Sequence, residues 1–150
     1  MTTDRRYLLD TNVLSETRKR RMDANVSAFL ERADSHSLYL SVLTLGELER
    51  EIEIKRQDDP DAADPIGEWL ALSVRDFANN ILPVDENVAR IWGHLSVDRT
   101  RPVIDALIAA TAIAHDLVLV SRNLKDFEGI DVETLDPWKS GAKSPNRRLT

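Results

Sequence analysis

The sequence predicts an α/β protein, a three-layer α/β/α sandwich with a mainly parallel sheet. Short apolar runs that are typical of buried strands alternate along the chain with longer segments of helical pattern. This alternation favours strand–helix–strand units, in which helices cover the faces of a parallel sheet. Neither an internal repeat nor a linker divides the chain.

The first half contains two of the expected strands. The apolar run Tyr7–Leu9 ends at a polar stretch and indicates a buried strand, which is followed by short helices over Val13–Arg18 and Asn25–Ala33. Leu38–Val42 is the next apolar run, and it leads into a helix over Thr44–Lys55.

The second half begins with a polar break at Gln57–Pro60. The helix expected after it contains Pro65, which is a candidate interruption because proline lacks the N–H that a helix needs. Leu117–Val120 is the clearest buried strand of the chain. The remaining predicted elements are helices over Asp61–Asn79 and Glu86–Val97, a helix within Arg101–Ala114, and strands over Ile81–Val84 and Val132–Leu135.

Length and composition suit one globular domain. The chain has 150 residues, 42% hydrophobic and 31% charged, which is enough for a core of its own. We expect a single domain over residues 1–138 and a flexible polar tail over 139–150. No apolar run has the length of a membrane span, and the start lacks the apolar core of a signal peptide, so the expected location is the cytoplasm, without a membrane partner. The chain has no cysteine, which excludes disulfides and thiolate zinc sites.

One carboxylate lies in an otherwise apolar helix. Pro102 suits a helix start, and from Val103 to Ala114 only Asp105 and Thr111 are polar. A helix that is apolar on all sides is normally buried, and burial of a lone carboxylate costs several kcal/mol unless a cation, donors or water compensate. The helix macrodipole explains an acid in the first turn but not its apolar neighbours. Asp105 is therefore expected to have a partner or to lie at the mouth of a cleft.

Three further acids, Asp10, Glu47 and Asp126, follow predicted strands or open the next helix. Taken singly, Asp10 is equally explained as a helix N-cap, Glu47 as a surface acid and Asp126 as a turn or cap residue. The carboxyl ends of parallel strands, however, meet at one edge of a sheet, and ligands of open α/β sheets bind there. We therefore expect these acids to gather with Asp105.

A cluster of three or four carboxylates predicts a cation site. The carboxylates repel one another, which raises their pKa values or requires a cation. Ligation by oxygen alone suits Mg²⁺ or Mn²⁺ rather than zinc. Such a site can activate water and stabilise the charge that develops on a phosphodiester.

The formal net charge of -6 argues weakly against a nucleic-acid binder. Basic residues are nevertheless grouped after Asp10 and around Asn123. We name Arg18, Arg20, Arg122 and Lys125 as candidate contacts to RNA phosphates. An ordinary solvent-facing basic surface explains each group equally well.

Four motifs in this order resemble the PIN-domain family, more narrowly the VapC toxins of bacterial toxin–antitoxin pairs and especially their FitB-like branch. The motifs are LLDTNVLSE at Leu8–Glu16, TLGEL at Thr44–Leu48, IDALIAATA at Ile104–Ala112 and VSRNLKDF at Val120–Phe127. Asp136–Trp138 also resembles the end of that branch. The resemblance implies a metal-dependent endoribonuclease that uses Mg²⁺ or Mn²⁺, acts on RNA and is held inactive by a cognate antitoxin. It also implies a homodimer or a larger toxin–antitoxin assembly.

The resemblance also assigns roles to residues of this chain. Asp10, Glu47 and Asp105 match the acidic metal-site positions of the family. The fourth position departs from some relatives, because Asn123 stands where they have Asp. We therefore take Asp126 as the charged contributor and Asn123 as a neutral ligand or substrate contact. Residues that match positions around these acids, with a supporting role, are Thr11, Asn12 and Ser121.

Three other readings start from the same residues. A phosphohydrolase of the haloacid dehalogenase type needs a second Asp two residues after the first, where this chain has Asn12. A receiver-like phosphoacceptor domain needs an Asp at the end of the middle strand, and Leu38–Val42 ends without one. A catalytically inactive PIN-like binding module is disfavoured by the three matching acids, although Asn123 keeps it open.

Overall fold

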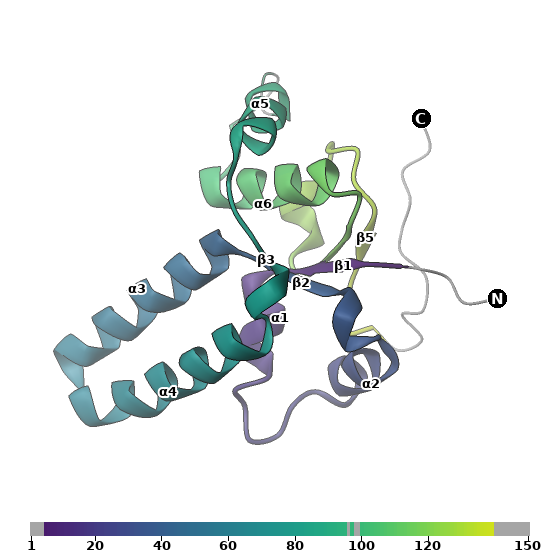
Figure 1. The fold of residues 1–150 in the computed structure, drawn as a ribbon. Helices are drawn as coiled ribbons and strands as arrows, with labels where there is room; N and C mark the ends of the chain where they lie inside the picture. Colours follow the sequence, from purple (N-terminus) through teal and green to yellow (C-terminus); the bar gives the residue numbers. More distant parts are fainter. Residues whose placement is uncertain (1–4, 96, 98–99, 140–150) are drawn as a thin grey trace.

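Parallel strands form one sheet in the order β3–β2–β1–β4–β5 (Figure 1). The computed structural model describes residues 5–95, 97 and 100–139. The tail predicted over 139–150 lies outside these residues, apart from Lys139. The strands of the described part are β1 (Tyr7–Leu9), β2 (Leu38–Ser41), β3 (Ile81–Leu82), β4 (Val118–Val120) and β5 (Thr134–Leu135). Every neighbouring pair of strands is parallel.

Helices connect successive strands. They are α1 (Thr11–Glu16), α2 (Ala24–Arg32), α3 (Val42–Asp58), α4 (Pro60–Asp76), α5 (Glu86–Leu95) and α6 (Val103–Ala114). Short 3₁₀ turns lie at η1 (Ser35–Ser37), η2 (Ala78–Asn80) and η3 (Leu124–Phe127). No helix of the described residues combines the length and the apolar character that a membrane crossing requires.

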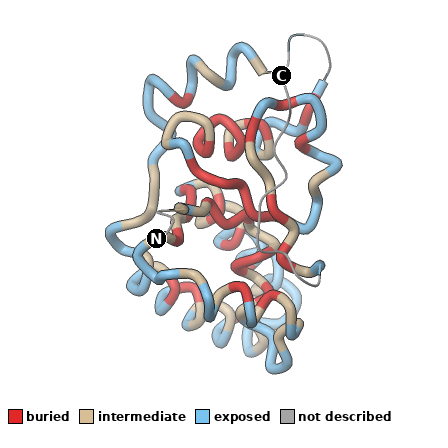
Figure 2. Tube along the Cα trace, turned by 90° about the vertical axis from the view of Figure 1, so that its right-hand side faces the viewer, coloured by how far each residue is buried: buried red, intermediate tan, exposed pale blue. Residues whose placement is uncertain are grey.

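The strands bury both of their faces, which makes the fold a three-layer sandwich (Figure 2). Side chains alternate between the faces of a strand, so Leu9 and Val120 pack with α1 and α2, where Val13 and Phe29 are buried. Their neighbours point the other way: Leu8, Leu117 and Leu119 pack against Ile108, Ala109 and Ala112 of α6. The predicted α/β/α architecture with a parallel sheet is confirmed.

The helices α3 and α4 pack side by side as a hairpin that extends from the sheet (Figure 1). The hairpin departs from the sequence prediction in two details. Helix α3 begins at Val42 rather than Thr44, because Ser41 Oγ accepts the backbone N–H of Leu43 and caps the helix. Helix α4 continues through Pro65, so the predicted interruption there is wrong. The packing of α4 along α3 compensates for the backbone hydrogen bond that Pro65 cannot make.

Helix α6 lies within the segment predicted to be helical, Arg101–Ala114, and is the most buried helix of the described chain, although its first turn is open. Residues from Ala106 to Ala112 are largely buried against the sheet, whereas Val103 and Ile104 are exposed. Helix α5 packs on α6 rather than on the strands. The first turn of α6, which carries Asp105, therefore lies at the boundary between core and solvent.

Candidate active site

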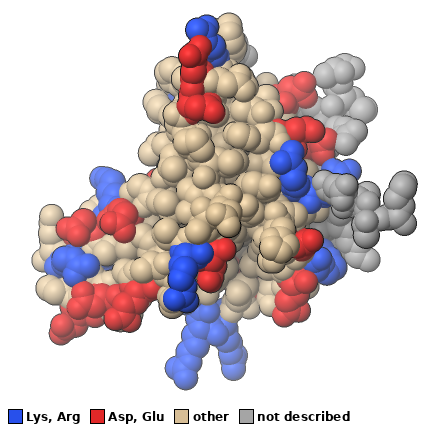
Figure 3. Space-filling model, viewed as in Figure 1, with Lys and Arg blue, Asp and Glu red and all other residues tan. Residues whose placement is uncertain are grey.

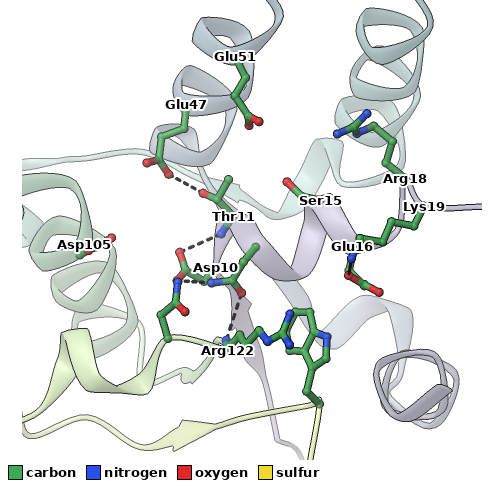
Figure 4. Close-up of a pocket in the computed structure, with 13 residues that line it drawn as sticks. Asp10, Thr11, Ser15, Glu16, Arg18, Lys19, Glu47, Glu51, Asp105 and Arg122 are labelled. Atoms are coloured by element: carbon green, nitrogen blue, oxygen red, sulfur yellow. Dashed lines mark hydrogen bonds and ion pairs between the residues drawn. The ribbon is translucent and has the colours of Figure 1, made fainter. Parts of the chain in front are cut away.

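The carboxyl edge of the sheet holds an open pocket with a volume of about 450 Å³. Asp10 follows β1, Glu47 lies in the second turn of α3 after β2, and Asp105 lies in the first turn of α6. All three line this pocket, and Figure 4 shows them facing it from three separate elements. The structure therefore brings together three of the four acids that the sequence selects.

Asp10 is both a helix N-cap and a pocket residue. Its Oδ1 accepts the backbone N–H of Thr11 at 2.8 Å. Its Oδ2 accepts the Ser121 hydroxyl at 2.8 Å and, at 3.4 Å, the Asn12 side-chain amide. Only 6% of Asp10 is exposed. One side chain with a fixed orientation thus both caps α1 and lines the pocket.

Asn12 and Ser121 connect α1 to the loop after β4. Asn12 Nδ2 donates to Ser121 Oγ at 3.2 Å, and Asn12 Oδ1 accepts the backbone N–H of Arg122 at 3.2 Å. Ser121 Oγ also accepts the backbone N–H of Asn123 at 3.0 Å. These bonds fix the geometry around Asp10, which is the supporting position that the sequence predicts for Asn12 and Ser121.

Glu47 is held by a hydroxyl chain. Thr11 Oγ1 donates to Glu47 Oε1 at 2.6 Å (Figure 4). Thr11 Oγ1 also lies 3.0 Å from the hydroxyl of Thr44, which is fully buried. The carboxylate of Glu47 is therefore oriented by α1 as well as by its own helix.

Asp105 lies in the first turn of α6, whose N-cap residue, Pro102, provides no side-chain cap. Its pKa is raised to about 6, first by burial and then by the charges of Asp10, Asp126 and Glu47. The predicted cleft-mouth position of Asp105 agrees with this half-buried environment.

The pKa of Asp10 is also raised. Burial is the main cause, and the charges of Glu47 and Asp126 add to it, while hydrogen bonds from Ser121 and the Thr11 N–H oppose it. Besides the cost of burial, both acids thus experience repulsion from neighbouring carboxylates, which hydrogen bonds oppose at Asp10. A cation in the pocket would relieve it.

Asp126 and Asn123 occupy different positions relative to the pocket. Asp126 lies in η3 and is exposed, and its charge reaches both Asp10 and Asp105, but it does not line the pocket. Asn123 does line it. The assignment of Asp126 as the fourth acid remains a prediction that rests on its charge.

The candidate phosphate contacts divide in the same way. Arg18 and Arg122 line the pocket, whereas Arg20 and Lys125 do not. Figure 3 shows acidic and basic side chains interspersed over the visible face, without one broad basic patch.

The pocket also contains residues that the sequence did not single out. Glu51, one turn after Glu47 on α3, is exposed and lines the pocket as well. Buried Glu16 pairs with Lys19 at 2.9 Å and accepts the backbone N–H of Asp23 at 2.8 Å. The spacing of Glu16 and Lys19 by three residues was the available signal. The remaining pocket residues without a predicted role are Ser15 and Trp138.

The donor set fits a hard divalent cation. Asp10, Glu47 and Asp105 present only carboxylate oxygens, which Mg²⁺ and Mn²⁺ prefer. Within residues 5–95, 97 and 100–139, no three His, Cys, Asp or Glu side chains come together closely enough to hold a metal ion by themselves. Asp10, Glu47 and Asp105 therefore line one pocket without forming a closed set of three ligands.

The parallel sheet and the acidic pocket at its carboxyl edge define a class, that of α/β proteins with a carboxylate-lined cleft suited to hard cations. Within this class the family is shown by sequence: the PIN domain family model matches residues 7–133. The chain belongs to the PIN-domain family, as its four motifs predict.

Its relatives include known toxins. The chain is 34% identical to the toxin FitB of Neisseria gonorrhoeae, over 87% of this chain and 97% of FitB. It is 30% identical to the VapC ribonuclease Y4jK of Sinorhizobium fredii, over 88% and 97% of the two chains. The crystal structure of FitAcB from Neisseria gonorrhoeae has the same fold, with a TM-score of 0.79, 32% identity, and coverage of 88% and 98%. Other solved structures that share the fold are toxin–antitoxin complexes.

Proposed function

We propose that this protein is the toxin of a toxin–antitoxin pair and a divalent-metal-dependent endoribonuclease that hydrolyses RNA phosphodiesters. The observation that carries the proposal is the convergence of Asp10, Glu47 and Asp105 on one pocket, where Asp10 and Asp105 have raised pKa values. The names of its relatives, a toxin and a VapC ribonuclease, support the same activity.

Asp10 and Asp105 would hold Mg²⁺ or Mn²⁺, and Glu47 would complete the site directly or through water. When bound, the ion supplies positive charge for the phosphate and lowers the pKa of water. Asp126 adds negative charge to this end of the sheet, and Asn123 offers a neutral contact to the RNA.

Each of the protein's own residues then has a separate role in the hydrolysis. Ser121, Asn12 and the Thr11 N–H keep the Asp10 carboxylate in one orientation. Glu47, oriented by Thr11, takes a proton from the attacking water while the oxygen of that water forms a bond to phosphorus. The bond from phosphorus to the leaving oxygen breaks, and that oxygen takes a proton from solvent. Arg18 and Arg122, at the pocket wall, bind neighbouring phosphates.

An antitoxin partner follows from the relatives in toxin–antitoxin complexes. We propose that the cognate antitoxin inhibits the enzyme, that the toxin acts in the cytoplasm, and that it forms a homodimer or a larger assembly with its antitoxin. Co-expression of the short reading frame next to the gene should relieve the growth arrest that the toxin causes. Growth arrest that persists with every neighbouring frame would contradict the pairing.

The nuclease proposal is tested by incubating purified protein with RNA and Mn²⁺, with and without EDTA. Cleavage should require Mn²⁺, stop in EDTA and return with excess Mn²⁺. Glu47→Gln should abolish it, and Glu49→Gln, a matched change on the exposed face of α3, should leave it intact. RNA binding without metal-dependent cleavage would instead identify an inactive binding module.

A further inference from the structure

Arg122 and Trp138 form a cation–π pair at the wall of the pocket. Arg122 follows β4 and Trp138 follows β5, and because β4 and β5 are parallel neighbours, the two residues emerge side by side at the carboxyl edge of the sheet. The guanidinium carbon of Arg122 lies 5.0 Å from the centroid of the Trp138 ring. Both residues line the pocket that contains Asp10, Glu47 and Asp105.

Trp138 is fixed in place from several sides. Its backbone N–H donates to Asp136 Oδ1 at 2.9 Å, and its carbonyl accepts the side-chain amide of Asn25 at 2.8 Å. Its ring packs against the core cluster that lies between the sheet and helices α1 and α2. The indole therefore presents a fixed surface to Arg122.

The backbone of Arg122 is held by a hydrogen bond, whereas its side chain is exposed to solvent. Its N–H donates to Asn12 Oδ1, which links it to the Asp10 network. The side chain is exposed, reaches along the pocket wall (Figure 4) and forms no ion pair with any carboxylate among residues 5–95, 97 and 100–139. Cover for the core explains the Trp138 ring. A contact to a phosphate uses the charge of Arg122 but does not explain why its planar guanidinium lies over this ring.

A guanidinium that lies on an indole has one face occupied and its other face and its edge donors available. Nucleobases stack on such planes, and single-stranded nucleic acids are commonly bound by this stacking. A phosphate would need only a point charge, for which a lysine would suffice.

We propose that Arg122 and Trp138 form a nucleobase subsite, in which one base of a single-stranded RNA stacks on the Arg122 guanidinium with Trp138 behind it. This inference rests on the proposed ribonuclease function and adds to it the part of the substrate that this wall binds. The base stacks while the backbone of its strand passes Asp10, Glu47 and Asp105. Because the bases of a single strand are free to stack, the subsite should bind single-stranded RNA more tightly than duplex RNA.

The test compares two nonamers that carry the same number of phosphates: oligouridine and an abasic ribose nonamer. Binding is measured by fluorescence anisotropy in the Asp105→Asn background, which blocks cleavage and removes one carboxylate from the pocket. The oligouridine should bind about tenfold more tightly than the abasic nonamer, a difference of about 1.4 kcal/mol. Equal affinities would overturn the proposal.

Substitutions separate stacking from charge. Arg122→Lys keeps the charge and should reduce the tenfold preference to less than threefold, while binding of the abasic nonamer stays unchanged. Trp138→Ala should have the same effect, and Trp138→Phe should retain most of the preference. Arg75→Ala, a matched loss of an exposed cation on α4, should not alter the ratio. Because Trp138→Ala also removes core packing, the exposed Arg122→Lys variant decides the outcome if the former fails to fold.

The subsite and the nuclease function fail in different ways. With metal and cleavable RNA, Arg122→Lys should raise KM several-fold and leave kcat unchanged. Metal-dependent cleavage by the unsubstituted protein together with equal binding of both nonamers overturns the base subsite alone. Absence of any metal-dependent cleavage overturns the nuclease proposal on which the subsite rests.

Discussion

Thr11 Oγ1 donates a 2.6 Å hydrogen bond to Glu47 Oε1, across 36 positions of sequence. A hydroxyl has one proton. Since Thr11 gives its proton to the carboxylate, the hydrogen bond of 3.0 Å between the two threonine hydroxyls must be donated by Thr44. A directed chain therefore runs from buried Thr44 through Thr11 to Glu47, and it holds the carboxylate toward the pocket.

Thr44→Val should weaken catalysis without unfolding the protein. Valine has nearly the same shape but no hydroxyl, so Thr11 loses its donor and Glu47 loses part of its orientation. The loss of about 1 kcal/mol corresponds to a kcat roughly fivefold lower. The measurement is kcat for RNA cleavage with Mn²⁺, with thermal unfolding as a check on the fold. Thr44→Ser, which keeps the hydroxyl, should restore kcat, and failure of this rescue would indicate a packing role only.

Asp10→Asn and Asp105→Asn should each abolish metal-dependent RNA cleavage, by at least about 100-fold, because each removes a carboxylate from the proposed cation site. Growth arrest on expression should disappear as well. Circular dichroism should show an intact fold. Full activity in either variant would refute the assignment of these two acids.

Much of the fold follows from the local sequence. The strands β1 and β4 and the helix α6 are apolar runs bounded by polar residues or proline, and α6 lies within the segment predicted to be helical. Helix α3 begins two residues earlier than predicted. Val42 and Leu43 have side chains that suit a strand, but the cap formed by Ser41 starts the helix at Val42. The continuity of α4 through Pro65 depends on its packing against α3, which no local pattern reports.

The site residues that follow a strand could be predicted from the sequence. Asp10 and Glu47 each follow a strand, and parallel pairing of β1 with β2 and β4 brings such positions together. Thr44 and Trp138 were not predictable in this way. A threonine between two leucines and a tryptophan near the end of the chain have many explanations, and only their tertiary contacts, with Thr11 and Arg122, give them a place in the site.

Asp126→Ala should impair cleavage more than Asn123→Ala does. The charge of Asp126 acts on both Asp10 and Asp105, whereas Asn123 contributes a neutral side chain at the pocket wall. Loss of the charge should also weaken the binding of Mn²⁺, seen as a higher Mn²⁺ concentration at half-maximal rate. The two variants are compared in one assay at several Mn²⁺ concentrations. The reverse order would assign the fourth position to Asn123.

Asp105→Asn should stabilise the metal-free protein at neutral pH. The carboxyl of Asp105 has a pKa of about 6 in the fold, against 3.8 ordinarily. The folded state therefore binds more protons between these values, so its stability falls as the pH rises from about 4 to 6 and stays lower above that. Asparagine removes this loss of stability, which for a half-exposed group is about 1 kcal/mol after solvent screening.

In EDTA, the Asp105→Asn variant should show a higher Tm than the unsubstituted protein at pH 7.5 and no difference at pH 3.5. Added Mg²⁺ should then stabilise the unsubstituted protein more than the variant, because a cation that binds only the folded state adds to its stability. A Tm difference that is the same at both pH values would show that Asp105 titrates normally.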